Sequence, residues 1–249
     1  MLKPQIVSIA DGVHNANLEV SRARILQGGS WKKQRTIILY PSADTIPMKV
    51  VLPFMSMATP PNQAVHRMAL LGMEIGDAYS SAIEAILANG ELAGWEYLMT
   101  IEADNLIRPD TLVRLIESME KYPQYACIGA LYWTKGFGGV PQIWGDKSDP
   151  VMNFRPQPPR LPHENDGMVE CWGTGMGANL WRLPMFKDQR LRRPWFKTIN
   201  GVNGPGIGTQ DLYFWGDAQK FGYRCAVDCK ITCGHYDLEG KFGPPDTVW

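Results

Sequence analysis

The stretch YLMTIEADNLIRPDTLVRLI, residues 97–116, changes abruptly from apolar to acidic and back to apolar. Its first five residues, 97–101, form a short apolar run of the kind that is typical of a strand buried on both faces. Two carboxylates one residue apart, Glu102 and Asp104, follow this run directly. Carboxylates are rarely fully buried unless they are paired or bind a metal ion. The stretch therefore predicts a strand that ends in an acidic pair, and the question is what that pair holds.

The chain on either side alternates between strand-like and helix-like segments. Strand-like runs occupy residues 36–40, 126–133, 169–183 and 224–235. Apolar residues at helical spacing occupy residues 66–90, 111–119 and 212–223. This alternation predicts an α/β fold with a mostly parallel central sheet and helices on both faces. Ligands bind beyond the carboxyl ends of the strands in such sheets, which is where Glu102 and Asp104 lie.

The remaining segments are rich in glycine and proline and predict irregular structure. We expect residues 42–63 to be irregular with one short helix, and residues 135–166 to form a loop excursion. The glycines of residues 200–208 permit large backbone changes, as in a lid over a ligand, although a passive surface loop has the same composition. Thr209 is expected to cap the helix that follows.

Length and composition fit one soluble domain. The 249 residues are 45% hydrophobic and carry a formal net charge of zero, which gives no global sign of nucleic-acid or membrane binding. We expect a single domain over residues 1–249, with a core at about 36–235, an N-terminal extension at 1–35 and a C-terminal tail at 236–249. The sequence shows neither a signal-peptide pattern nor an apolar run long enough to span a bilayer, so we expect a cytoplasmic protein.

The cysteines are expected to be reduced, because there are five of them in a chain without a secretion signal. Cys225, Cys229, Cys233 and His235 could be read as a zinc site. Their spacing matches no standard structural zinc pattern, and strand positions two apart share a face. Small side chains on a buried strand are therefore the favoured interpretation.

From the residues alone, the acidic pair has two interpretations. A strand end can aim two carboxylates at one divalent cation, since hard cations prefer carboxylate oxygen. Alternatively, Glu102 and Asp104 form a solvated pair near the N-terminus of the next helix.

Four short motifs in a fixed order favour the first interpretation. They are Glu102-Ala103-Asp104, Gly173-Thr174-Gly175, Gln210-Asp211 and Gly234-His235. Together, over an α/β background from about residue 36 to 235, they resemble the glycosyltransferases of the GT-A fold, close to the family 2 type. The resemblance implies a Rossmann-like single domain that moves a sugar from a nucleotide-sugar donor, most often a UDP-sugar, to a hydroxyl acceptor.

The resemblance also implies roles for individual residues. Asp211 is expected to be the catalytic base, and a single base on the acceptor side implies inversion at the sugar carbon, with retention as the alternative outcome. Asp104, His235 and Glu102 are expected to hold Mn²⁺ or Mg²⁺, with the imidazole favouring Mn²⁺. The expected donor-binding residues are Pro41, Ser42, Glu102, Ala103 and Asp104. The expected acceptor-side residues are Gly173, Thr174, Gly175, Gln210 and Trp172.

The chain departs from the family pattern at three places. Glu102 stands where relatives carry Asp, and Gln210 stands where they carry Glu. The Arg-Asn pair that many relatives have in the first long helix is replaced by GDAYSSA, residues 76–82. The missing Arg-Asn pair affects the expected recognition of the base and phosphates of the donor.

Further segments resemble a phage-borne branch of the fold that lies near viral enzymes modifying DNA bases. They are TIPMKVVLPFMSMATPPNQ (residues 45–63), LYWTKGFGG (131–139), PWFKT (194–198) and GYRCAVDCKITCGH (222–235). This implies a 5-hydroxymethylated base, such as hydroxymethylcytosine, in double-stranded phage DNA as acceptor, with action in the host cytoplasm. A surface polysaccharide or a lipid-linked glycan is the alternative acceptor.

Two sets of side chains bear on the acceptor. The basic run Arg190, Arg192, Arg193 and Lys197 is either a phosphate-binding patch or a solvated charged face. The aromatic residues Trp133, Trp172, Trp195 and Phe196 either stack on a sugar or base or belong to the core.

Functions of other classes remain open at this point. A nucleotidyltransferase would share the sheet and the metal, but a glycine-rich basic loop is expected after its first strand, where this chain has YPSADTIP, residues 40–47. A phosphatase with an aspartyl nucleophile would carry Asp at position 102. A non-catalytic sugar-binding module would need neither a base nor a metal-bridged diphosphate.

Overall fold

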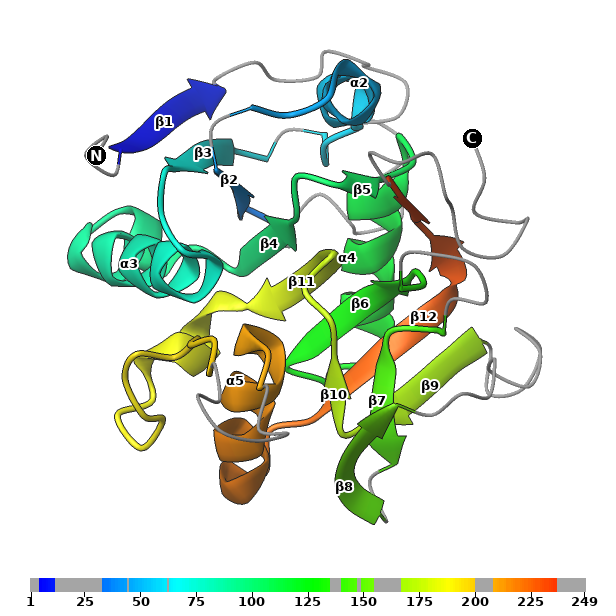
Figure 1. Cartoon of the computed structure of the whole chain (residues 1–249). Coiled ribbons are helices and arrows are strands. Elements are labelled where there is room, and N and C mark those ends of the chain that lie inside the picture. Colours follow the sequence, from blue (N-terminus) through cyan, green and yellow to red (C-terminus); the bar gives the residue numbers. More distant parts are fainter. Residues whose placement is uncertain are drawn as a thin grey trace.

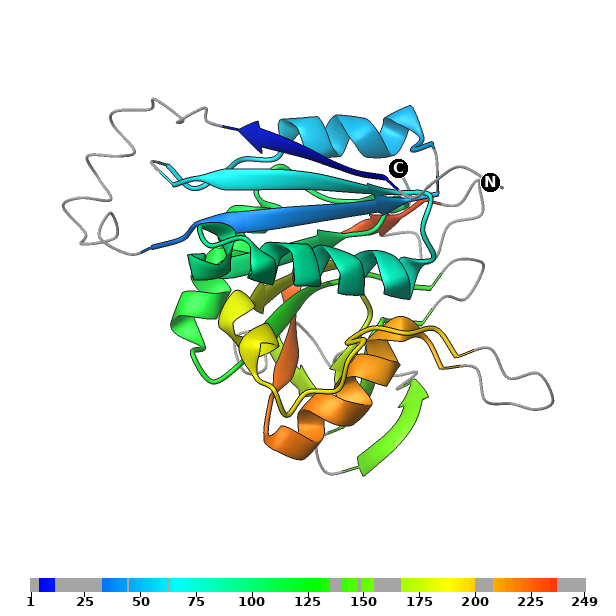
Figure 2. The ribbon, with the colours of Figure 1, turned by 90° about the vertical axis from the view of Figure 1, so that its left-hand side faces the viewer.

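The fold is known from a computed structural model, which describes residues 5–11, 33–43, 45–61, 63–134, 140–146, 149–154, 167–199 and 208–236. A central sheet crosses the molecule, with helices on both sides of it (Figures 1 and 2). Within the described residues the sheet has eight strands, in the spatial order β1 (Gln5–Asp11), β3 (Val65–Leu71), β2 (Thr36–Ser42), β4 (Tyr97–Ile101), β11 (Ala178–Arg182), β6 (Cys127–Leu131), β12 (Cys225–Thr232) and β9 (Met168–Cys171).

One strand direction predominates in this sheet. β2 is parallel to β3 and to β4, and β6 is parallel to β12. β11 lies between β4 and β6 and is antiparallel to both, so that β4 and β6 point the same way. The edge strands β1 and β9 are antiparallel to their neighbours. The carboxyl ends of the parallel strands therefore meet at one edge of the sheet, where ligands bind in folds of this kind.

Each face of the sheet is covered by helices that bury an apolar stripe. α3 (Ile75–Ala88) and α5 (Gln210–Ala218) pack on one face, with Tyr79, Phe214 and Trp215 in the same hydrophobic cluster. α2 (Met48–Ser56) and α4 (Thr111–Lys121) pack on the other face through a second cluster. The stripe predicted on α4 is buried as expected and consists of Leu112, Leu115, Ile116 and Met119. Burial on both faces explains why β2, β4 and β6 read as continuous apolar runs.

Several short elements complete the fold. A three-stranded sheet has the order β10 (Gly173–Thr174), β7 (Ile143–Asp146), β8 (Asp149–Phe154), and a two-stranded sheet pairs β13 (Gly234–His235) with β5 (Asn105–Leu106). The 3₁₀-helices are η2 (Leu92–Gly94), η4 (Leu183–Lys187) and η5 (Gln219–Phe221). The fold class agrees with the sequence prediction of an α/β fold with a mostly parallel central sheet and helices on both faces.

Two local predictions were wrong. Residues 66–90 were expected to be helical, but β3 occupies the first part and the helix begins only at Ile75. β3 is hydrogen-bonded on both sides, by β1 and β2, and Gly72 then turns the chain with a φ of 70°. Residues 135–166 were expected to be a loop excursion, yet β7 and β8 form an antiparallel pair there. Pairing between distant segments thus overrode local periodicity at both places.

The ends of the predicted core also differ from expectation. β1 comes from the predicted N-terminal extension and pairs with β3, so the sheet begins before residue 36. The predicted tail beyond residue 236 and the glycine loop at 200–207 lie outside the described residues. Within the described residues, none of the helices has the length and apolar character needed to cross a membrane.

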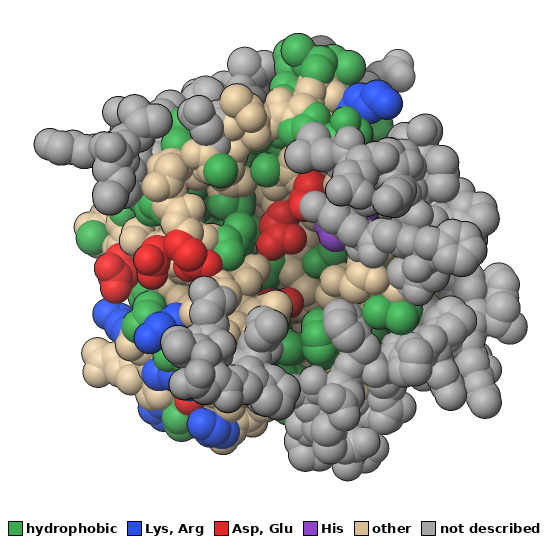
Figure 3. Space-filling view, in the orientation of Figure 1, with side chains coloured by type: hydrophobic (Ala, Val, Ile, Leu, Met, Phe, Trp, Pro, Cys, Tyr) green, Lys and Arg blue, Asp and Glu red, His purple; other side chains and the backbone are tan. Residues whose placement is uncertain are grey.

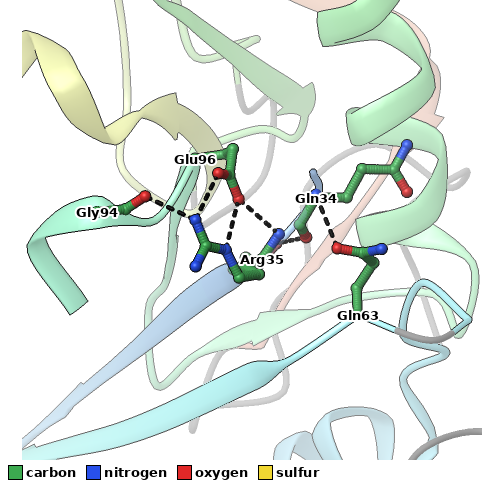
Figure 4. Close-up of polar contacts among 6 residues, drawn as sticks. Gln34, Arg35, Gln63, Gly94 and Glu96 are labelled. Atoms are coloured by element: carbon green, nitrogen blue, oxygen red, sulfur yellow. Dashed lines mark hydrogen bonds and ion pairs between the residues drawn. The ribbon is translucent and has the colours of Figure 1, made fainter. Parts of the chain in front are cut away.

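The end of β2 opposite the site is fixed by polar contacts (Figure 4). The Arg35 guanidinium forms an ion pair with Glu96 at 2.8 Å and donates to the Gly94 carbonyl, and the Arg35 backbone N–H donates to Glu96 at 3.1 Å. The Gln34 backbone N–H donates to Gln63 Oε1 at 3.0 Å. Glu96 directly precedes β4, and Gln63 lies just before β3. These contacts therefore link the start of β2 to the starts of its two parallel neighbours.

Candidate active site

The acidic motif lies at the carboxyl end of β4, as the sequence predicted. Its turn is held by two backbone hydrogen bonds, because Glu102 N–H donates to the Gly177 carbonyl and Asn105 N–H donates to the Glu102 carbonyl, both at 3.1 Å. Asn105 Nδ2 donates to Asp104 Oδ1 at 3.1 Å. The fully buried Asn105 amide therefore orients the Asp104 carboxylate.

His235 reaches the same place from the other end of the chain. β13 pairs with β5 so that His235 lies opposite Asn105, and the Tyr236 N–H donates to the Asp104 carbonyl at 2.6 Å. This register leaves 3.4 Å between His235 Nε2 and Asp104 Oδ2. The two side chains predicted as metal ligands thus lie next to each other.

The other ring nitrogen fixes the tautomer of His235. Nδ1 lies 2.6 Å from the Trp133 carbonyl oxygen, which can only accept, so Nδ1 carries a proton. In the neutral imidazole Nε2 is then a bare acceptor that faces a carboxylate oxygen, and two acceptors attract only through a proton or a cation between them. A backbone carbonyl that holds the far nitrogen in this way is typical of metal-ligating histidines.

The residues present fit a divalent cation only in part. Among the described residues, no three His, Cys, Asp or Glu side chains converge as a complete metal centre. Asp104 and His235 supply one oxygen and one nitrogen, which suits a cation that completes its coordination with substrate phosphates and water. The zinc alternative has no support in this part of the chain either, since the cysteines are buried free thiols.

A cavity of about 430 Å³ opens beside the acidic motif. Figure 3 shows this region as a hollow in which acidic side chains gather beside a histidine. All five predicted donor-binding residues line the cavity, namely Pro41, Ser42, Glu102, Ala103 and Asp104. Sequence reasoning missed the other lining residues, which are Ala43, Thr45, Pro47, Met73, Ile75 and Tyr236.

Asp211 lies in the first turn of α5, directly after Gln210. It is only 5% exposed, and its Oδ1 accepts a hydrogen bond from the Leu212 backbone N–H at 2.9 Å. Burial raises the pKa of the Asp211 carboxyl. Thr209 is the N-cap residue as predicted, but its hydroxyl makes no capping hydrogen bond.

Gln210 joins the two sides of the site. Its Nε2 donates to Glu102 Oε1 at 3.3 Å, which links the first turn of α5 to the end of β4. The charges of Glu102, Asp104 and Asp211 act on the buried hydroxyls of Tyr79 and Tyr132 and, after burial itself, raise the pKa of both phenols. Glu102, Asp104 and Asp211 therefore all lie within electrostatic reach of the Tyr79 and Tyr132 phenols.

The predicted acceptor-side glycines are explained by close packing. A Cβ on Gly173 would lie 3.1 Å from the Trp215 ring, and one on Gly175 would overlap the Tyr132 hydroxyl. Thr174 is fully buried. The turn thus needs small residues in order to fit, whatever it binds.

Most of the aromatic candidates belong to the core. Trp172, Trp195 and Phe196 are 8%, 1% and 1% exposed, so they cannot stack on a ligand as they stand. Trp133 is half-buried and lies next to the site through its carbonyl.

The basic run is partly neutralised. Arg190 forms an ion pair with Asp188 at 2.6 Å, and Arg192 donates to the Tyr213 carbonyl and, through its backbone, to Asp217. The Arg193 guanidinium lies 4.7 Å from the centre of the Trp195 ring. Among the described residues, Arg193 and Lys197 are the two exposed cations of this run for which no acidic partner is seen.

Comparisons with known proteins bear on the fold. Neither a protein-family model nor a curated protein matches the chain. The solved structure of A197 from STIV is similar, with a TM-score of 0.59 and 14% identity over 86% of this chain and 92% of that chain. TarS from S. aureus in complex with UDP-GlcNAc has a TM-score of 0.48 and 12% identity, and the match covers 84% of this chain and 60% of that one. CMP:2-keto-3-deoxy-manno-octonic acid synthetase complexed with CTP has a TM-score of 0.42 and 9% identity, covering 82% and 93%.

At sequence identities of 9% to 14%, a similar structure shows a similar fold and does not show a shared activity. The likeness to A197 shows a shared fold over most of both chains. The other two have TM-scores of 0.48 and 0.42, which are too low to support an argument.

Proposed function

We propose that the chain is a metal-dependent glycosyltransferase that moves a sugar from a nucleotide-sugar donor, a UDP-sugar by family resemblance, to a hydroxyl group. The observation that carries the proposal is the approach of His235 Nε2 to Asp104 Oδ2 at 3.4 Å, beside a cavity lined by the predicted donor residues. When the imidazole is neutral, a bare Nε2 that faces a carboxylate is an arrangement that a divalent cation stabilises.

The donor would bind in the cavity of about 430 Å³. Pro41, Ser42 and Ala103 offer it backbone and small side chains, while Glu102 can accept a hydrogen bond from a donor hydroxyl. Asp104 and His235 would hold Mn²⁺ or Mg²⁺, which when bound neutralises the diphosphate so that it can leave.

Asp211 would act from the acceptor side as the general base. It takes the proton from the acceptor hydroxyl as that oxygen attacks the anomeric carbon, and the bond between that carbon and the diphosphate breaks. Attack from the face opposite the leaving group inverts the configuration. Gln210 keeps Glu102 and Asp211 in fixed relation, because it is bonded to the first and adjacent in sequence to the second.

Nucleotide binding to metal-ligand variants tests the proposal. The wild type should bind UDP-sugars in a calorimetric titration only with Mn²⁺ present, and a ligand at a hundred times its Kd should stabilise the fold by about 2.7 kcal/mol. Asp104→Asn should abolish this binding, and His235→Ala should raise the Mn²⁺ requirement by about tenfold or more. Asp110→Asn, on a carboxylate that is 57% exposed in the same segment, is the matched control. Undiminished Mn²⁺-dependent binding by Asp104→Asn would refute the metal site.

For the acceptor, we propose a 5-hydroxymethylated base in double-stranded phage DNA. The support is the resemblance of the phage-like segments and the cations Arg193 and Lys197 beside Trp195, which can hold a phosphate backbone. The target hydroxyl must reach Asp211 from the major groove or by base flipping. Duplexes with hydroxymethylcytosine or hydroxymethyluracil should gain the mass of one sugar per modified base. Transfer only to a surface polysaccharide or lipid-linked glycan would replace this acceptor, and release of pyrophosphate would instead indicate a nucleotidyltransferase.

A further inference from the structure

Tyr132 lies between the two halves of the site and was not among the residues that the sequence singled out. It directly follows β6 and is 3% exposed. Its ring meets the His235 ring edge to face, with centroids 5.5 Å apart and planes at 79°. Its hydroxyl accepts a hydrogen bond from the Gly177 backbone N–H at 2.9 Å. One side chain therefore touches the imidazole at one end and the glycine turn at the other.

The glycine turn, residues 173–177, packs closely around this tyrosine. A Cβ on Gly177 would lie 2.5 Å from Tyr132 Cζ and 2.7 Å from its Cε1, and a Cβ on Gly175 would overlap the hydroxyl oxygen. Real Cβ atoms do not approach other atoms so closely, so both positions require glycine as long as Tyr132 is in place.

The contact continues to the acidic motif. The Gly177 peptide donates to the Tyr132 hydroxyl through its N–H, and its carbonyl accepts from the Glu102 N–H at 3.1 Å. A shift of the Tyr132 hydroxyl would therefore move Gly177 and, with it, the backbone of Glu102. Glu102 in turn is bonded to Gln210, beside Asp211.

We propose that Tyr132 is a positioning residue that sets the separation between the metal-side imidazole of His235 and the acceptor-side turn. The inference rests on the proposed function, and it assigns separate tasks to the two ends of the side chain. The ring supports His235, whereas the hydroxyl fixes the turn and, through Gly177, Glu102 and Gln210, the setting of Asp211.

A cycle of stability measurements tests the arrangement without reference to activity. Gly175→Ala should lower the free energy of unfolding in urea, and at least half of this loss should disappear in the Tyr132→Phe background, which lacks the overlapping oxygen. Gly177→Ala is the matched control, since its added Cβ would meet ring carbons that Phe retains, so its loss should be equal in both backgrounds. Equal losses for Gly175→Ala in both backgrounds would contradict the arrangement.

Binding and turnover separate the two ends. Tyr132→Phe keeps the ring, so Mn²⁺-dependent UDP-sugar binding should stay within about twofold while kcat falls on the order of tenfold or more, because a small displacement of the reacting groups is costly. Tyr132→Leu removes the ring and should weaken Mn²⁺ by about tenfold as well. An unchanged kcat in Tyr132→Phe, or an unchanged Mn²⁺ titration in Tyr132→Leu, would overturn the role of Tyr132 alone. A wild type that binds neither Mn²⁺ nor any UDP-sugar would overturn the proposed function itself.

Discussion

At Asp211, burial opposes the charge that a general base needs. The side chain is 5% exposed, and its raised pKa records the cost of ionising it away from water. A raised pKa keeps a base strong near neutral pH, since a carboxylate of ordinary pKa is a weak proton acceptor there. The same burial means that ionised Asp211 lowers the free energy of unfolding, and this loss can be measured without a substrate.

The stability of Asp211→Asn should therefore depend on pH. Because the folded-state pKa is raised, protonated Asp211 contributes stability below the ordinary carboxyl pKa of about 3.9, and this contribution is lost as the pH rises through the folded-state pKa. Asn cannot ionise and can still accept from the Leu212 N–H. We expect Asp211→Asn to be more stable than the wild type at pH 7 and equally stable near pH 3, by urea denaturation. Each unit of pKa shift is worth about 1.4 kcal/mol.

The same variant should keep donor binding and lose about 10²- to 10⁴-fold in transfer rate, as is typical when a general base is removed. A gain in stability at pH 7 that persists unchanged at pH 3 would mean that ionisation of Asp211 is not its source. Near wild-type transfer by Asp211→Asn would require another base.

At the scale of elements, the N-terminus of α3 is hydrogen-bonded to Thr198, which precedes α5 in the chain. Glu74 is the N-cap of α3, and its Oε2 accepts from the Gly76 and Asp77 backbone N–H groups at 2.8 and 3.2 Å. Its Oε1 accepts from the Thr198 hydroxyl at 2.6 Å. One carboxylate thus starts a helix and holds the chain that leads toward Asp211.

Replacement of Glu74 should reveal both tasks. Glu74→Ala should cost about 1 to 2 kcal/mol in urea denaturation, since it removes a helix cap and leaves the Thr198 hydroxyl without its acceptor. Thr198→Val keeps the cap and should cost less, about 0.5 to 1.5 kcal/mol. A loss for Thr198→Val that equals that of Glu74→Ala would show that the cap contributes nothing.

The element scale also shows what sequence can and cannot predict. β4 and the acidic pair after it were predictable, because a strand buried on both faces is apolar throughout and its end is marked by charge. β3 was not, since its residues also have helical spacing and only pairing with β1 and β2 decides between the two. Tyr132, Asn105 and the Trp133 carbonyl could not be placed at the site either. Their roles arise from the register of β13 on β5 and from packing between segments, although the position of Asn105 directly after Asp104 was a usable signal.

For the whole molecule, the zero net charge predicts that any DNA binding depends on a small patch. Arg190 and Arg192 already have acidic or carbonyl partners, so Arg193 and Lys197 are the cations of the basic run expected to meet phosphates. A plot of the logarithm of the association constant for a hydroxymethylated duplex against the logarithm of the salt concentration should therefore have a shallow slope. The magnitude of this slope should fall by about 0.9 for each phosphate contact that is removed.

The double variant Arg193→Ala and Lys197→Ala should flatten this plot, as measured by fluorescence anisotropy over a range of salt concentrations. Arg190→Ala, whose guanidinium is held by Asp188, is the matched control and should leave the slope nearly unchanged. A steep slope that the double variant does not alter would place the nucleic-acid contact elsewhere on the molecule.

The pairing of β13 with β5 has a consequence for biosynthesis. Asp104 and Asn105 are translated well before His235 and Tyr236. His235 pairs with Asn105, and the Tyr236 N–H donates to the Asp104 carbonyl, so these contacts form only after the later residues are made. At about 5 to 20 residues per second, the first half of the site waits on the order of ten seconds for the second. A nascent chain that has folded its first parallel strands therefore displays an acidic strand end with no histidine beside it, and under the proposed function it could hold cation and nucleotide together only once His235 has been translated.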